Sequence, residues 1–83
     1  MNSVIRTPKQ LGHALREARV RTKLTQTEVA LVSGLRQATI SEIEAGEGAT
    51  KVSTLCTLLA ALNLELNLVP RNSDASQDIE DLF

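Results

Sequence analysis

Apolar residues recur at steps of three and four positions over most of residues 8–62, which is the period of amphipathic helices. The first stripe follows Thr7 and Pro8, where Thr7 is a typical N-cap, Pro8 a typical first helical residue, and Gln10 the residue that closes a capping box. This pattern predicts a helix over residues 8–22. Its expected buried stripe is formed by Leu11, Ala14, Leu15 and Ala18.

A second capping-box sequence, from Thr25 to Glu28, lies directly before a short apolar segment. It predicts a helix over about residues 26–32. Gly34 follows, and glycine readily adopts the positive φ angle that ends a helix. The expected apolar face of this short helix is formed by Val29, Ala30 and Val32.

Two further helices are predicted over residues 36–45 and 52–62. The first has a narrow apolar face at Ile40 and Ile43, and most of its other positions are polar. The second has a broad apolar face suited to covering the other helices, formed by Val52, Leu55, Cys56, Leu58, Leu59 and Leu62. The protein is therefore expected to be mainly α with four helices, with Cys56 buried and His13 on the surface.

The period changes from helical to two over residues 64–69, which predicts a β-strand. The chain has no second strong strand, unless Val4-Ile5 forms one, and a lone strand leaves its backbone groups unpaired. A core of this size is also thin, so a second subunit would add stability. We therefore expect a homodimer in which the same strand of two subunits pairs. The expected dimerisation residues are Leu64, Leu66 and Leu68.

The formal net charge of −1 combines two unlike segments. Residues 1–71 carry nine basic and six acidic side chains, a net charge of +3, whereas residues 72–83 carry four acidic side chains and no basic one. We expect residues 1–71 to form one folded domain and residues 72–83 to be a disordered acidic tail. The mildly basic domain is compatible with a nucleic-acid partner.

Composition excludes several classes of protein. One cysteine and one histidine leave no internal disulfide, no metal cluster and no catalytic constellation, so neither an enzyme nor a cofactor is expected. Phe83 is the single aromatic residue, which argues against recognition of single strands by base stacking. The longest apolar stretch, residues 58–62, is far too short to cross a membrane, and a cytoplasmic protein is expected.

Residues 26–45 fit a helix, a tight turn and a second helix. Ala30 is placed where the two helices would approach closely, and Gly34 lies in the turn. The segment from Leu24-Thr25-Gln26 to Ile40-Ser41-Glu42-Ile43-Glu44-Ala45-Gly46 resembles the Xre/Cro repressor family of helix-turn-helix proteins. The resemblance covers about residues 8–64 and implies a four-helix, lambda-repressor-like DNA-binding domain.

In that family the second helix of the motif lies in the major groove, and the resemblance also implies a salt bridge between Arg19 and Glu44. Gln26 is then expected to meet a phosphate, Gln37 to read adenine with its donor and acceptor, and Ala38 to touch a thymine methyl. Glu42 could accept from cytosine, but a solvated surface residue is an equally good interpretation. The full set of expected DNA-binding residues is Gln26, Thr27, Arg36, Gln37, Ala38, Thr39 and Ser41.

An acidic tail follows the predicted strand. The chain resembles HipB-type antitoxins, the partners of HipA-type kinases, with Arg36-Gln37-Ala38-Thr39-Ile40-Ser41 as the recognition helix and Leu64-Glu65-Leu66-Asn67-Leu68 as the strand. This resemblance implies a homodimer that binds inverted repeats in double-stranded DNA, represses its own operon and neutralises a Ser/Thr kinase toxin. The alternative is a stand-alone Xre-family repressor without a toxin partner. An enzyme or a pure interaction scaffold is the third and weakest hypothesis, because the chain offers no phosphate-binding loop and no nucleophile with a base.

Overall fold

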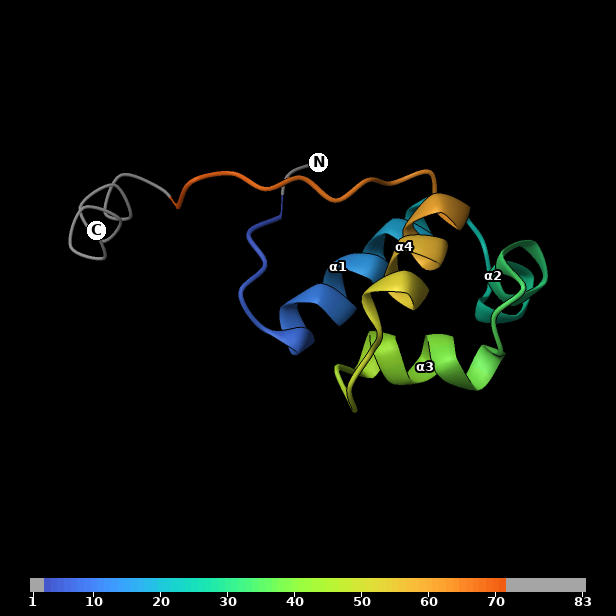
Figure 1. The fold of residues 1–83 in the computed structure, drawn as a ribbon. Coiled ribbons are helices and arrows are strands. Elements are labelled where there is room, and N and C mark those ends of the chain that lie inside the picture. The colour runs from blue at the N-terminus through green and yellow to red at the C-terminus, as the bar shows by residue number, and fades with distance from the viewer. Residues whose placement is uncertain (1–2, 72–83) are drawn as a thin grey trace.

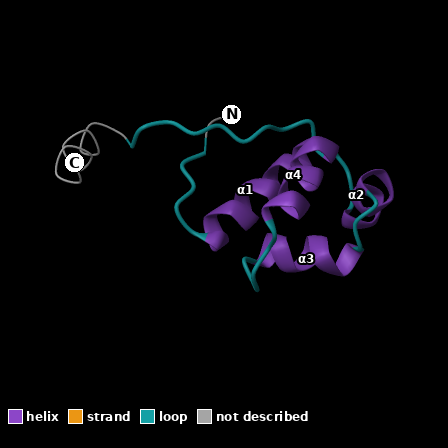
Figure 2. Cartoon of the chain, viewed as in Figure 1, coloured by secondary structure: helices purple, strands orange, loops and turns teal. Residues whose placement is uncertain are grey.

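The structure, a computed structural model, describes residues 3–71, and four helices form most of that part of the chain (Figure 1). Figure 2 shows helices joined by loops over the described residues. The prediction of a mainly α chain with four helices is confirmed, and Arg36 is the N-cap of the third helix instead of its first residue. The helices are α1 (Pro8–Arg21), α2 (Gln26–Ser33), α3 (Gln37–Ala45) and α4 (Val52–Ala61).

Side chains cap the first two helices at their N-termini. The Thr7 hydroxyl accepts from the Gln10 N–H at 3.1 Å, as predicted, but the Gln10 side chain accepts from the Arg6 N–H and not from that of Thr7. This departs from the expected capping box by one residue. The box at α2 is complete, because Thr25 accepts from the Glu28 N–H at 3.1 Å and donates its own N–H to the Glu28 carboxylate at 2.8 Å.

The turn between α2 and α3 is tight because Gly34 adopts a left-handed conformation, with a φ angle of 78°. Its N–H donates to the Ala30 carbonyl at 2.9 Å and thereby closes the last turn of α2. This conformation is costly for residues with a side chain, so the prediction that Gly34 ends the helix is confirmed. The short turn sets α3 at the edge of the domain (Figure 1).

The four helices share one core, to which each contributes at least one residue. The narrow inner face predicted for α3 is confirmed, since Ile40 and Ile43 are buried. Three other expectations were wrong: Val32 and Val52 are each 69% exposed, and Cys56 is exposed on α4. The period of a helix indicates its apolar flank but not whether a neighbour covers that flank. The buried cluster is formed by Leu15, Val29, Ile40, Ile43, Leu58, Leu59 and Leu62.

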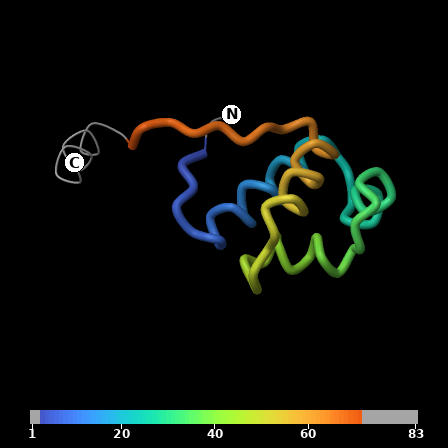
Figure 3. Tube along the Cα trace, in the orientation of Figure 1, coloured from blue at the N-terminus to red at the C-terminus, as the bar shows by residue number. Residues whose placement is uncertain are grey.

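After α4 the chain leaves the helices as an extended segment (Figure 3). Leu64 packs against the core and donates its N–H to the Leu59 carbonyl at 2.8 Å, whereas Leu66 and Leu68 are exposed. Residues 64–69 form no strand within the single chain, and neither do Val4 and Ile5. Pairing of residues 64–69 between two subunits stays a prediction, because it requires a second copy. The acidic tail expected over residues 72–83 lies outside the described residues.

Candidate nucleic-acid interface

The outer face of α3 carries the side chains that the sequence singles out. Gln37, Ala38 and Ser41 are exposed on it, while Ile40 is fully buried on the opposite face. Arg36 is exposed at the N-cap, and Thr39 is only half-buried, toward the side of the helix that faces the start of α4. α3 thus presents a polar surface while its apolar side fixes it to the domain.

The N-terminus of α2 lies beside this face. Gln26 is the first residue of α2 and is half-buried, whereas Thr27 is exposed. Five of the seven predicted residues are therefore exposed on α3, its N-cap or the start of α2, and Thr39 lies at the edge of this surface. Gln26 is the seventh and lies deeper, between the two helices. The hydrogen bonds of Gln26, described below, explain this deeper position.

Gly12 sets how closely α1 approaches α3. A β-carbon at position 12 would lie 2.5 Å from the carbonyl oxygens of Ile43 and Glu44, far inside van der Waals contact. Gly12 is buried within a helix, where glycine otherwise costs stability. Sequence reasoning missed this residue, because a glycine inside a helical pattern gives no indication of which element lies against it.

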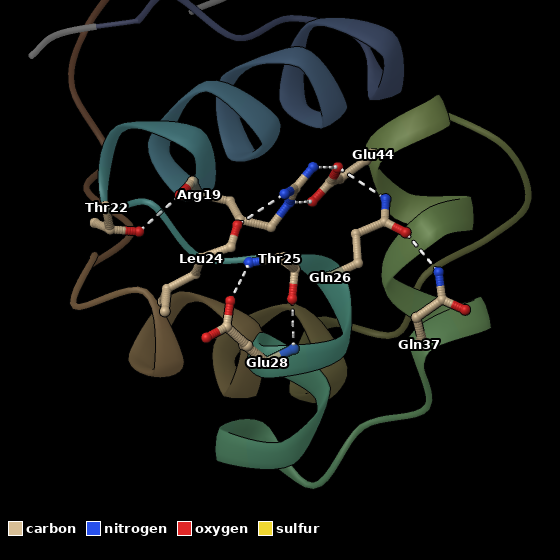
Figure 4. Close-up of polar contacts among 8 residues, drawn as sticks. All are labelled: Arg19, Thr22, Leu24, Thr25, Gln26, Glu28, Gln37 and Glu44. Carbon is tan, nitrogen blue, oxygen red and sulfur yellow. Dashed lines mark hydrogen bonds and ion pairs between the residues drawn. The ribbon is translucent and has the colours of Figure 1, made fainter.

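Arg19 and Glu44 form an ion pair between α1 and the last turn of α3 (Figure 4). Arg19 Nε lies 2.7 Å from Glu44 Oε2 and Nη2 lies 3.0 Å from Oε1, the two-pronged geometry of a strong guanidinium–carboxylate pair. The side chains are 12% and 5% exposed, and hydrogen bonding to Glu44 raises the pKa of Arg19. The pair expected from the family resemblance is therefore present, with Glu44 inside α3.

Arg19 also fixes the loop that precedes α2. Its Nη1 donates to the Leu24 carbonyl at 2.9 Å. A single guanidinium thus connects α1, the entry to α2 and the end of α3. Because five donors diverge from one rigid plane, arginine suits such a junction better than lysine.

Gln26 extends this cluster to the exposed face of α3 (Figure 4). Its Nε2 donates to Glu44 Oε1 at 3.1 Å, and its Oε1 accepts from Gln37 Nε2 at 2.6 Å. The sequence predicts a phosphate contact for Gln26 and a separate base contact for Gln37. The structure instead places them in one hydrogen-bonded chain that runs from Arg19 through Glu44 and Gln26 to Gln37, which we call the polar relay.

The remaining surface of the described residues carries several basic side chains. Arg16 and Lys23 are exposed at and after α1, while the exposed His13 lies 3.1 Å from Glu17. Among residues 3–71, no group of three or more His, Cys, Asp or Glu side chains is arranged to hold a metal ion. None of the helices described is both long enough and apolar enough to cross a membrane.

The short α2, the left-handed glycine and the outward polar face of α3 define a helix-turn-helix protein. The helix-turn-helix family HTH_3 matches residues 15–69, which is more than half of the chain. The chain belongs to this family of DNA-binding proteins.

Within the family the chain is similar to antitoxins. It is 32% identical to the antitoxin HipB of Escherichia coli K12 over 76 residues, which cover 92% of this chain and 86% of HipB. It is 41% identical over 61 residues to HigA2, a predicted antitoxin of Mycobacterium tuberculosis. That match covers 72% of this chain but only 60% of HigA2, so the chain spans less than two thirds of that relative.

The fold is also similar to those of solved HipB structures and of a restriction-modification controller protein. A HipB complex with a 20mer named O4 matches with a TM-score of 0.76 and 34% identity, over 82% of this chain and 96% of that one. HipB in a HipA-HipB-O2-O3 complex matches with a TM-score of 0.75 at 34% identity, with the same coverage. The restriction-modification controller protein C.AhdI of Aeromonas hydrophila has a TM-score of 0.67 and 29% identity, over 70% of this chain and 88% of C.AhdI.

Proposed function

We propose that this protein is a homodimeric, sequence-specific double-stranded DNA-binding antitoxin of a HipBA-like module, acting in the cytoplasm. In this role it represses its own operon and neutralises a Ser/Thr kinase toxin. The observation that carries the DNA-binding part is the outer face of α3, where Gln37 stands exposed at the helix start and is held by Gln26. This places a side chain with both a donor and an acceptor on the surface that the fold leaves open.

The chemistry of the face suits a major groove. Gln37 can contact adenine through its amide, Ala38 can meet a thymine methyl, and Arg36 can contact guanine or a phosphate. The hydroxyls of Thr27, Thr39 and Ser41 suit phosphate or base edges. Gln26 acts mainly through Gln37, and its backbone N–H at the start of α2 remains the part suited to a phosphate.

A dimer is supported by the exposed side chains of the segment after α4. Leu66 is 55% and Leu68 is 91% exposed, which is unfavourable for large apolar residues in water. Pairing this segment with its copy in a second subunit would cover these side chains and satisfy the backbone groups of residues 65–69. Such a dimer would present two α3 helices to the two halves of an inverted repeat.

The antitoxin role is supported by the relatives, because the matched HipB proteins are named antitoxins and one solved HipB structure is a complex with HipA. The alternative is a stand-alone repressor with the same DNA chemistry. It is supported by the similarity to C.AhdI, whose name describes a controller of restriction and modification. A HipA-like kinase gene beside this reading frame, and copurification of the kinase, would favour the antitoxin.

The DNA-binding proposal is tested with a pool of duplexes of random sequence and with the region upstream of the gene. We expect enrichment of an inverted repeat with half-sites about one helical turn, roughly 34–36 Å, apart. We also expect the affinity to fall steeply when the salt concentration is raised. Enrichment of no sequence, or equal binding to enriched and scrambled duplexes, would contradict the proposal.

A further inference from the structure

The polar relay fixes the orientation of the Gln37 side-chain amide, and this orientation affects which purine the amide can bind. We infer that Arg19 and Glu44, acting through Gln26, are positioning residues that make Gln37 favour adenine over guanine. The inference rests on the proposed function, because it concerns the same DNA-binding face. It assigns a role in specificity to two side chains that are almost buried and too deep to touch a base.

The orientation of the amides is set first by the carboxylate of Glu44. Two nitrogens of Arg19 fix both oxygens of Glu44, at 2.7 Å and 3.0 Å. An ionised carboxylate only accepts hydrogen bonds, so a neighbouring amide must turn its nitrogen toward it. Gln26 does so, with its Nε2 at 3.1 Å from Glu44 Oε1. The reverse orientation would set two acceptors against each other in a part-buried position, which is unfavourable.

The orientation of the Gln26 amide in turn fixes that of the Gln37 amide. Because the nitrogen of Gln26 faces Glu44, its oxygen faces α3 and accepts from Gln37 Nε2 at 2.6 Å. One of the two N–H groups of Gln37 is thereby occupied within the protein. The side chain can offer a ligand only one remaining N–H and its oxygen.

This remaining pair distinguishes the two purines. The major-groove edge of adenine presents one acceptor and one donor, which one N–H and one oxygen can satisfy. The edge of guanine presents two acceptors, N7 and O6, so a glutamine that contacts both needs both of its N–H groups. A freely rotating Gln37 could supply both, whereas Gln37 in the relay cannot. The relay therefore acts against guanine more than it adds affinity for adenine.

The test breaks the relay at two different links. The double variant Arg19→Met with Glu44→Leu replaces the ion pair with apolar side chains of similar size, an exchange that often preserves stability. The single variant Gln26→Met keeps the ion pair and removes the linking amide. The matched control is Arg6→Met with Glu17→Leu, which removes one base and one acid at exposed positions outside the relay.

Binding is measured by fluorescence anisotropy on the duplex enriched from the random pool and on a copy with G·C in place of one A·T pair. The pair changed is the one at which Gln37→Ala abolishes the preference. We expect the unmodified protein and the control to prefer adenine by about tenfold or more, the range of a good bidentate contact. In both relay variants this ratio should fall by about threefold or more, even if Gln26→Met also weakens binding to all duplexes alike.

A second measurement uses the protein without DNA. The side-chain amide resonances of Gln37, observed by NMR, should move toward those of an exposed glutamine in both relay variants and stay unchanged in the control. Unchanged purine ratios in folded relay variants would overturn the inference while leaving DNA binding intact. If the unmodified protein prefers no duplex, the proposed function fails and the inference fails with it, whatever the amide resonances show.

Discussion

The backbone of Glu44 lies so close to Gly12 that a β-carbon on Gly12 would come within 2.5 Å of the Glu44 carbonyl oxygen. Two helices of the domain therefore meet backbone to backbone at this point. The same stretch of α3 carries the Glu44 side chain that pairs with Arg19. The contact thus fixes the depth and angle at which α3 sits on α1.

Replacing Gly12 with alanine should destabilise the protein, although the same change at an open helix position stabilises it. The methyl group would push α1 from α3, and overpacking of this kind costs about 1–3 kcal/mol. The measurement is urea unfolding followed by circular dichroism. The control is Gly34→Asn, because a β-carbon at position 34 meets nothing within 4 Å and asparagine tolerates the left-handed conformation. Equal stability of the Gly12 variant and the unmodified protein would contradict the packing argument.

Removing one partner of the buried ion pair should be far more damaging than removing both. Arg19→Met leaves the Glu44 carboxylate without its two strongest donors, and such a loss typically costs about 3–5 kcal/mol. The double variant Arg19→Met with Glu44→Leu should recover most of this stability. Thermal unfolding of the single and double variants provides the check, and a double variant less stable than the single one would show that the pair itself supplies the stability.

The stability of α2 should decrease in acid through Glu28. The N–H of Thr25 donates to its carboxylate, and this bond lowers the pKa of Glu28 in the folded state. The unfolded state then binds the proton more readily, so the contribution is fully present above the ordinary range of a glutamate and is lost as the pH falls through and below that range. Glu28→Gln should flatten this acid dependence in urea unfolding at several pH values. The same slope in both proteins would refute it.

The segment after α4 should control assembly and not folding. Leu66→Asp with Leu68→Asp alters two exposed side chains, so the helices should remain while light scattering reports a monomer. Leu64→Asp should instead destabilise the fold, because Leu64 packs against the core. Leu31→Asp is the control, since Leu31 is 81% exposed on α2. A dimer that persists in the double variant would place the interface elsewhere.

Gln37→Ala should weaken binding to the enriched duplex by about 1–3 kcal/mol and leave non-specific binding nearly unchanged. The reason is that base contacts specify a sequence whereas phosphate contacts act on all sequences alike. Titrations on enriched and scrambled duplexes at two salt concentrations separate the two effects. Equal losses on both duplexes would show that Gln37 does not read a base.

Much of the fold could be predicted because its signals are local. Thr7, Thr25 and Gly34 each fix a helix end through bonds or a φ angle within a few residues, and all three act as expected. The inner face of α3 followed from the spacing of Ile40 and Ile43. Such features need no knowledge of neighbouring elements.

The errors concern contacts between elements. Cys56 and Val32 belong to apolar patterns, but no other helix of the described chain covers their flanks. Gly12 was missed because its role depends on the α3 backbone. At the candidate site, the exposed polar face of α3 was predicted. The bonds of Gln26 to Glu44 and Gln37 were not, because they depend on how α2 meets α3, which spacing along one helix cannot indicate.

The anchoring of Leu64 affects which spacing between two DNA half-sites a dimer of this protein would accept. Its N–H is bonded to the Leu59 carbonyl and its side chain is held by the core, so the segment proposed to join two subunits starts without a flexible linker. Two domains joined in this way would hold their two α3 helices at a fixed distance from each other. One added base pair between half-sites would rotate one half-site away from its α3 helix, and a dimer joined in this way should therefore bind that duplex more weakly.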